Sequence, residues 1–91
     1  MQLSFTDRTY LVTGGGSGIG KGVAAGLAAS GAKVMIIGRN AERLTAAAAE
    51  IKTEAQSGDV VAHPADVTDE DQVVGAVAAA TAWNGRLHGV V

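Results

Sequence analysis

Residues 13–20 read Thr13-Gly14-Gly15-Gly16-Ser17-Gly18-Ile19-Gly20, and the rest of the chain is organised around them. A short apolar segment with β character, residues 10–12, precedes this stretch, and a run of small residues with a helical pattern, residues 21–29, follows it. Glycines allow positive φ angles and let a ligand come closer than a Cβ would permit. The N-terminus of the following helix presents free N–H groups and a partial positive charge to an anion. This order of elements predicts a phosphate-binding loop.

Two common phosphate-binding patterns match this loop only in part. The dinucleotide pattern G-x-G-x-x-G can start at Gly14 and Gly16, but Ile19 stands where its third glycine belongs. The triphosphate pattern G-x-x-x-x-G-K-[ST] fits residues 15–21, but Gly22 replaces the hydroxyl residue that would bind Mg²⁺. A Mg²⁺-dependent ATP or GTP site is therefore the less favoured alternative.

A third pattern, T-G-x-x-x-G-x-G, is filled completely, by Thr13, Gly14, Gly18 and Gly20. With Ile19 before the last glycine, the loop resembles the cofactor loop of the short-chain dehydrogenase/reductase family. The resemblance covers the chain from about residue 6 to residue 91. It implies an α/β fold of the Rossmann-like, doubly wound type with a parallel sheet.

Length and composition limit the chain to one domain and exclude several function classes. The chain has 91 residues, a net charge of −2 and no cysteine, so a disulfide framework and a thiolate metal site are excluded. Acidic and basic residues are interspersed, so nucleic acid is not an expected partner. No apolar run reaches the length of a membrane span, and residues 1–8 lack the shape of a signal peptide. We therefore expect a cytoplasmic protein with no membrane association.

Strand and helix patterns alternate along the chain. Helical patterns lie between short apolar segments that predict strands at 9–12, 33–37, 59–62 and 87–91. Such alternation gives right-handed crossovers and a parallel sheet. The expected strand order is 3-2-1-4, with the ligand at the carboxyl ends of the first and fourth strands. We predict that residues 1–91 form the N-terminal half of a dinucleotide-binding Rossmann domain.

Capping residues predict where the helices begin and end. The first helix is expected from near Gly18 to Ser30, with Gly31 in the left-handed conformation that ends many helices. Asn40 is placed to cap the start of the second helix. Thr68 opens the third helix with the spacing of a capping box.

Three further expectations concern packing. Gly22 and Gly26 lower the helix propensity of the first helix, and we attribute them to close packing against the sheet or to room for the cofactor. Pro64 lacks a backbone donor, so the third strand is expected to break at residues 63–64. The third helix is expected to turn an inner face toward the sheet, made by Val73, Val77 and Ala80.

The second strand is followed by Gly38-Arg39-Asn40, where an NAD site normally has an Asp or Glu that binds the ribose 2′-OH. A carboxylate there would repel a 2′-phosphate, whereas a guanidinium can bind one through two hydrogen bonds. The alternative for Arg39 is a surface charge at a helix start, a position that the helix dipole disfavours for a cation. We predict NADP(H) rather than NAD(H), although Ser17 stands where many NADP-binding family members have a second basic residue.

Asp66 and Val67 follow the third strand. The resemblance implies that Asp66 accepts a hydrogen bond from the adenine amino group and that Val67 packs on the adenine ring. From residue chemistry alone, Asp66 is equally well a turn residue ahead of a cap at Thr68. The predicted cofactor-binding residues are Gly14, Gly16, Ser17, Gly18, Ile19, Gly20, Arg39, Asn40, Asp66 and Val67.

The remaining polar and aromatic residues are given structural roles. His63 and His88 have no second ligand at a metal-binding spacing and are expected at strand ends. Trp83 is expected to pack at a helix end, since no basic surface accompanies it. The acidic residues 69–71 read as a helix N-terminus, so no metal site is predicted.

The resemblance implies an NAD(P)-dependent oxidoreductase that moves a hydride between nicotinamide and a carbonyl, an alcohol or an activated double bond, often as a homodimer or homotetramer. The family uses a catalytic Tyr, a Lys four residues later, a Ser and an Asn. Tyr10 is the only tyrosine, and Gly14 stands four residues after it, so no catalytic residue is predicted within 1–91. We expect the cofactor-binding part of a longer reductase, with a non-catalytic dinucleotide-binding protein as the alternative. No substrate is predicted.

Overall fold

The computed structural model describes residues 8–14, 18–55, 58–85 and 87–90. The elements follow one another in the predicted alternating order. They are β1 (Thr9–Thr13), α1 (Gly18–Ala29), β2 (Lys33–Gly38), α2 (Ala41–Ala55), β3 (Asp59–Pro64), α3 (Glu70–Asn84) and β4 (Gly89–Val90).

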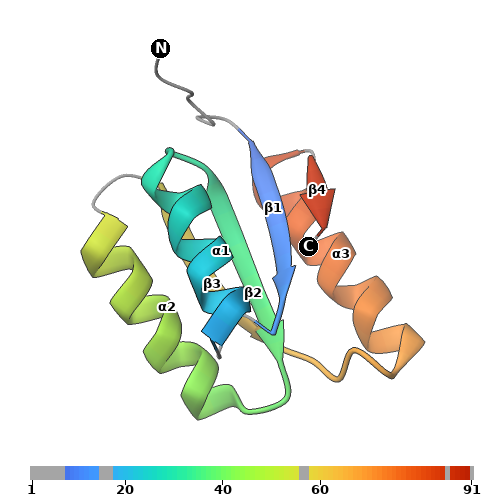
Figure 1. Ribbon diagram of the computed structural model, residues 1–91. Helices are drawn as coiled ribbons and strands as arrows, with labels where there is room; N and C mark the ends of the chain where they lie inside the picture. Colours follow the sequence, from blue (N-terminus) through green and yellow to red (C-terminus); the bar gives the residue numbers. More distant parts are fainter. Residues whose placement is uncertain (1–7, 15–17, 56–57, 86, 91) are drawn as a thin grey trace.

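The strands form one parallel sheet in the order β3-β2-β1-β4, which confirms the predicted order. Helices α1 and α2 lie on one face of this sheet and α3 lies on the other (Figure 1). The chain is therefore doubly wound: two crossovers run along one face, and the third returns along the opposite face to place β4 beside β1.

Two apolar clusters bury the two faces of the sheet. Side chains alternate along β2, so Val34 and Ile36 join the cluster with α1 and α2, while Met35 and Ile37 join the cluster with α3. A strand that is covered on both faces is continuously apolar, as its sequence indicated. Fully buried alanines of α1 and α3 complete these clusters: Ala24, Ala28, Ala76 and Ala80.

Most predicted helix ends are confirmed. Gly31 has a φ of 93° after α1, the left-handed conformation that glycine adopts without steric cost. Gly85 adopts the same conformation after α3, with a φ of 76°. The Asn40 side chain accepts a hydrogen bond from the backbone N–H of Arg43 at 3.0 Å, so it caps α2 as expected.

The predicted cap of α3 at Thr68 is wrong. Asp69 is the N-cap, and its carboxylate accepts from the backbone N–H groups of Asp71 and Gln72. Gln72 donates back to the Asp69 carboxylate at 3.2 Å. Thr68 has a different role, because its N–H and its hydroxyl both bind Asp66.

The predicted break at residues 63–64 is also wrong, since β3 continues to Pro64, which pairs with Gly38. Strand β3 lies at the edge of the sheet, where a proline is tolerated because one side of the strand has no ladder to complete. Strand β4, in contrast, begins later than predicted. The N–H of Thr9 donates to Nδ1 of the His88 ring at 3.0 Å, so His88 meets β1 partly through its side chain.

The inner face of α3 is only partly as predicted. Ala80 is buried, and Val73 and Val77 are half-buried, but the fully buried Ala76 was not anticipated. Among the helices that the structure describes, none combines the length and the apolar character that crossing a bilayer requires.

The explanation of Gly22 and Gly26 by close packing against the sheet is wrong. A Cβ at either position would meet no atom within 4 Å, and both residues are exposed. Close approach is instead concentrated at Gly20, where a Cβ would lie 2.3 Å from the carbonyl oxygen of Gly14. The glycine that the strand–helix junction requires is therefore Gly20.

Gly20→Ala and Gly22→Ala form a matched pair that tests this junction. We expect Gly20→Ala to destabilise the chain by about 1–3 kcal/mol, the usual cost of forcing atoms into a filled space. Gly22→Ala is expected to stabilise it by about 0.5–1 kcal/mol, because Ala is the better helix former. Urea unfolding of the two variants measures both effects. Equal changes in the free energy of unfolding would contradict the assignment.

Candidate cofactor-binding site

The described part of the glycine loop lies between the end of β1 and the start of α1. Gly14 has a φ of 66°, and its N–H donates to the carbonyl oxygen of Ile37 at 3.0 Å. Gly18 begins α1 and Gly20 lies against the Gly14 carbonyl. This contact brings the N-terminus of α1 to the carboxyl edge of the sheet. The predicted residues Gly16 and Ser17 lie outside the described residues.

The start of α1 has the character of an anion site. Its first turn contains no acidic residue, so no side-chain carboxylate offsets the partial positive charge of the helix N-terminus. The helices α2 and α3 differ in this respect, because each has an acid in its first turn. Of the three helix N-termini, that of α1 is therefore the best suited to bind a phosphate group.

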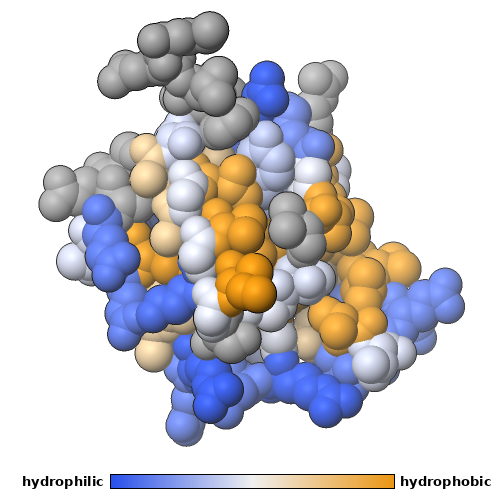
Figure 2. All heavy atoms as spheres, in the orientation of Figure 1, coloured by the Kyte–Doolittle hydropathy of each residue, from blue (hydrophilic) through white to orange (hydrophobic). Residues whose placement is uncertain are grey.

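The predicted residues Arg39 and Asp66 come together at the ends of β2 and β3. Nη2 of Arg39 lies 3.4 Å from Oδ2 of Asp66. The Arg39 side chain is 74% exposed, and that of Asp66 is 31% exposed. Figure 2 shows hydrophilic side chains gathered along the lower edge of the view, where these strands end in Figure 1. The guanidinium is thus held loosely at the carboxyl edge and remains open to a ligand.

Asp66 is held in a turn by the residues that follow it. Its Oδ1 accepts from the N–H of Thr68 at 2.9 Å and from the Thr68 hydroxyl at 2.7 Å. Its own N–H donates to Oε1 of Gln72 at 2.7 Å. The two hydrogen bonds from Thr68, first the hydroxyl and then the N–H, lower the pKa of Asp66; burial opposes this, and Arg39 adds to it. The turn role is thus present, and the adenine contact stays a prediction.

Sequence reasoning missed the parts played by Thr68 and Gln72. The signal was present, because an Asp followed two residues later by a Thr is typical of a turn in which the side chains bind each other and the backbone. Gln72 could have been found as the third residue after an Asp cap. Asn40 has its side-chain oxygen engaged in the α2 cap, so that oxygen is less available to a ligand than predicted.

Two apolar side chains of the predicted site are exposed. Ile19 is 88% exposed in the first turn of α1, and Val67 is 49% exposed beside Asp66. Other large exposed apolar side chains of the described residues are Val74 on α3 and Val90 on β4. Exposed apolar surface next to an anion site fits a ligand that has both phosphates and an apolar ring.

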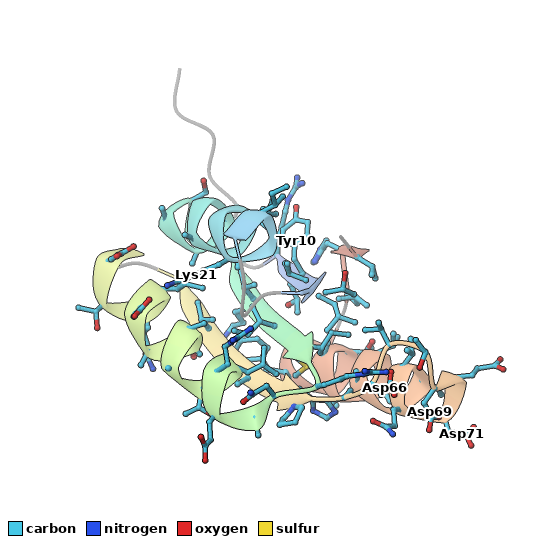
Figure 3. The ribbon with its side chains drawn as sticks, turned by 60° about the horizontal axis from the view of Figure 1, so that its bottom comes forward. Tyr10, Lys21, Asp66, Asp69 and Asp71 are labelled. Atoms are coloured by element: carbon cyan, nitrogen blue, oxygen red, sulfur yellow. The ribbon has the colours of Figure 1, made fainter. Side chains whose placement is uncertain are left out.

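Lys21 is paired with a residue of the neighbouring helix α2. Its Nζ forms an ion pair with Glu50 of α2, and Figure 3 shows it near α2, on the opposite side of the view from Asp66. In a triphosphate loop the equivalent lysine contacts the phosphates. The contact with Glu50 therefore counts against that alternative.

Trp83 and His88 have structural contacts. Trp83 packs against the α3 cluster, and Nζ of Lys33 lies 5.3 Å from the centre of its ring, a cation–π contact. His88 binds Thr9 of β1. Within residues 8–14, 18–55, 58–85 and 87–90, no group of His, Cys, Asp and Glu side chains is arranged to hold a metal ion.

Comparison with known proteins settles the family. The sequence profile of the short chain dehydrogenases matches residues 8–91. The chain belongs to the short-chain dehydrogenase/reductase family. A solved structure of a family member from Mycobacterium ulcerans is 62% identical with a TM-score of 0.91, and the match covers 97% of this chain and 32% of that one.

Two curated relatives have named activities. Levodione reductase of Leifsonia aquatica is 45% identical over 85 residues, which are 93% of this chain and 32% of the relative. Ipsdienol dehydrogenase of Ips pini is 37% identical over 91 residues, which are 100% of this chain and 32% of the relative. The chain therefore spans about a third of the length of the relatives it matches, all of it in the Rossmann-like fold that family members use to bind NAD(P)(H).

The Asp66 turn predicts how this carboxyl titrates. Its pKa is lowered from the ordinary value of 3.8, so it should lose its proton at a lower pH than the carboxyl of an unfolded chain. Any stability that the turn contributes is present above the unfolded pKa and is lost as the pH falls through the folded pKa. A carboxyl ¹³C NMR titration measures this. A midpoint at or above 3.8 would contradict the Thr68 hydrogen bonds.

Proposed function

We propose that the protein is an NADP(H)-dependent oxidoreductase that transfers a hydride between nicotinamide and a carbonyl, alcohol or enoyl substrate, and that this chain supplies the cofactor-binding part. The observation that carries the NADP(H) preference is Arg39, exposed at the carboxyl end of β2 directly after Gly38. No carboxylate occupies the end of β2 itself, where an NAD site has one.

The residues present fit such a cofactor. The tight junction between Gly14 and Gly20 would accept the pyrophosphate at the N-terminus of α1. Val67 offers an apolar surface for the adenine ring, and Arg39 would bind the 2′-phosphate. The distribution of charge agrees with this assignment, because the phosphates would meet a helix N-terminus and a guanidinium.

When bound, the nicotinamide supplies or accepts the hydride. The residues of this chain would bind and orient the remaining parts of the cofactor, namely the pyrophosphate, the adenine ring and the 2′-phosphate. Tyr10 does not take part, because its ring packs against the core and against Gly89, where a Cβ would lie 2.9 Å from it. The matched region is 32% of each relative's length. We propose that the catalytic groups lie in a region that corresponds to the rest of the relatives' chains.

Of the two curated relatives, one is named a reductase and the other a dehydrogenase. These names support a carbonyl or alcohol substrate. The proposal includes the cytoplasmic location and the homodimer or homotetramer expected from the sequence. A dinucleotide-binding protein without catalysis is the second candidate, and it would use the same glycine loop, Arg39 and Asp66.

Arg39→Ala tests the cofactor preference. We expect the affinity for NADPH to fall roughly ten- to hundredfold, the range for losing a hydrogen bond between charged groups, with little change for NADH. Arg43→Ala is the control, because Arg43 is an exposed arginine one turn further along α2. Calorimetric titration of both variants measures the affinities. If wild-type protein binds NADH as tightly as NADPH, the NADP(H) preference is wrong.

Lys21→Met separates the dinucleotide site from a triphosphate loop. Lys21 pairs with Glu50 of α2, so losing this exposed ion pair should change the NADPH affinity by no more than about fivefold. Titration with ATP and Mg²⁺ should show no binding in either protein. Tight Mg²⁺-dependent ATP binding that Lys21→Met abolishes would replace the dehydrogenase proposal by the triphosphate one.

A further inference from the structure

The two oxygens of the Asp66 carboxylate have different partners. Oδ1 accepts both hydrogen bonds from Thr68, and Oδ2 faces Nη2 of Arg39. A carboxylate is planar, so two donors on one oxygen fix the direction of the other. The Thr68 hydroxyl, together with the Thr68 N–H, therefore holds Oδ2 in its direction toward Arg39, although Thr68 itself does not contact Arg39 in any interaction that the structure describes.

The backbone of this turn is fixed from a second side. Gln72 accepts from the N–H of Asp66 through Oε1 and donates to the Asp69 carboxylate through Nε2. Asp69 in turn caps α3. The Asp66 backbone is thus anchored to the first turn of α3. Its carboxylate could still rotate, and the hydrogen bonds from Thr68 restrict that rotation.

Arg39 depends on this orientation. It is a long side chain, 74% exposed, and the contact with Oδ2 is a single one at 3.4 Å. A guanidinium has five N–H donors in a fixed plane, so one contact through Nη2 leaves other donors for a phosphate. A partner that restrains Arg39 without using up its donors reduces the ordering that a ligand must otherwise impose.

We propose that Thr68 is a positioning residue for 2′-phosphate recognition: its hydroxyl orients the Asp66 carboxylate, which holds Arg39 at the place where the cofactor's 2′-phosphate binds. This inference rests on the proposed function and deepens it. It assigns part of the NADP(H) preference to a threonine that lies outside the set of residues expected to touch the cofactor.

Thr68→Val removes the hydroxyl, keeps the side-chain shape and keeps the backbone N–H. The helix cap is provided by Asp69, so the fold should persist. The probes are 2′,5′-ADP and 5′-AMP, which differ by the 2′-phosphate, titrated calorimetrically into the full chain. The ratio of their affinities should fall about two- to fivefold in Thr68→Val, the range for an exposed ion pair.

Thr68→Ser retains the hydroxyl and should restore the wild-type ratio. Thr53→Val is the matched control, because Thr53 is also exposed and its hydroxyl donates to a backbone carbonyl, that of Ala49 at 2.9 Å. It should leave the ratio unchanged. A ratio that is unchanged or higher in Thr68→Val would overturn the positioning role, the higher value indicating that Asp66 competes with the phosphate for Arg39.

A second measurement separates positioning from a structural effect. If Thr68 acts through Asp66, Thr68→Val should not lower the affinity ratio further in an Asp66→Asn background. In the Thr68→Val single variant, the pKa of Asp66 should rise, because the hydrogen bond from the Thr68 hydroxyl that lowers it is lost. An equal drop in both backgrounds would overturn the proposal. If the wild-type protein binds neither probe, both the proposed function and this inference are wrong. If the wild-type protein prefers 2′,5′-ADP and Thr68→Val retains that preference in full, only the inference is wrong.

Discussion

The close approach of Gly20 to the carbonyl of Gly14 is the constraint on which the rest of this structure depends. With a Cβ excluded there, α1 can start directly beside the end of β1 and lie flat on the sheet. Its direction determines where β2 returns, and the same handedness then places α2 on that face. The anion site at the start of α1 therefore depends on this one backbone contact.

The site edge is assembled from residues that are far apart in the sequence. Arg39 follows β2 and Asp66 follows β3, and because neighbouring parallel strands end at the same edge, their side chains meet. Neither side chain is fully buried by this contact. The electrostatics of the edge are consequently mild, and an exposed pair of this kind is more readily opened by a ligand than a buried one would be.

The fold could be predicted from the sequence because each of its signals is local. Apolar strands, helix caps at Asn40 and Gly31, and the handedness of crossovers together require the order β3-β2-β1-β4. The contact between Arg39 and Asp66 was not predicted, although the same topology brings the ends of β2 and β3 together. The family resemblance depended on glycine spacing, which is a local signal too.

The errors concern choices between similar residues that only the three-dimensional surroundings decide. Thr68 and Asp69 are both good helix caps, and Asp66 decides between them by engaging Thr68. Pro64 stays in a strand because β3 is an edge, which sequence position alone does not reveal. The choice between the favoured dinucleotide loop and the triphosphate pattern that Lys21 fits in spacing also depends on the surroundings, because Lys21 pairs with Glu50 on a neighbouring helix.

The fully buried alanines determine which substitutions the helix–sheet contacts can accept. At Ala24, Ala28, Ala76 and Ala80 there is almost nothing to truncate, so the losses that follow from removing methylene groups have no counterpart at these four positions. Because these side chains are fully buried between the helices and the sheet, a larger one would have to displace its neighbours. Substitution at these four positions is therefore limited by the largest side chain that the packing admits, whereas fully buried side chains such as Leu11, Ile36 and Leu44 remain sensitive to truncation.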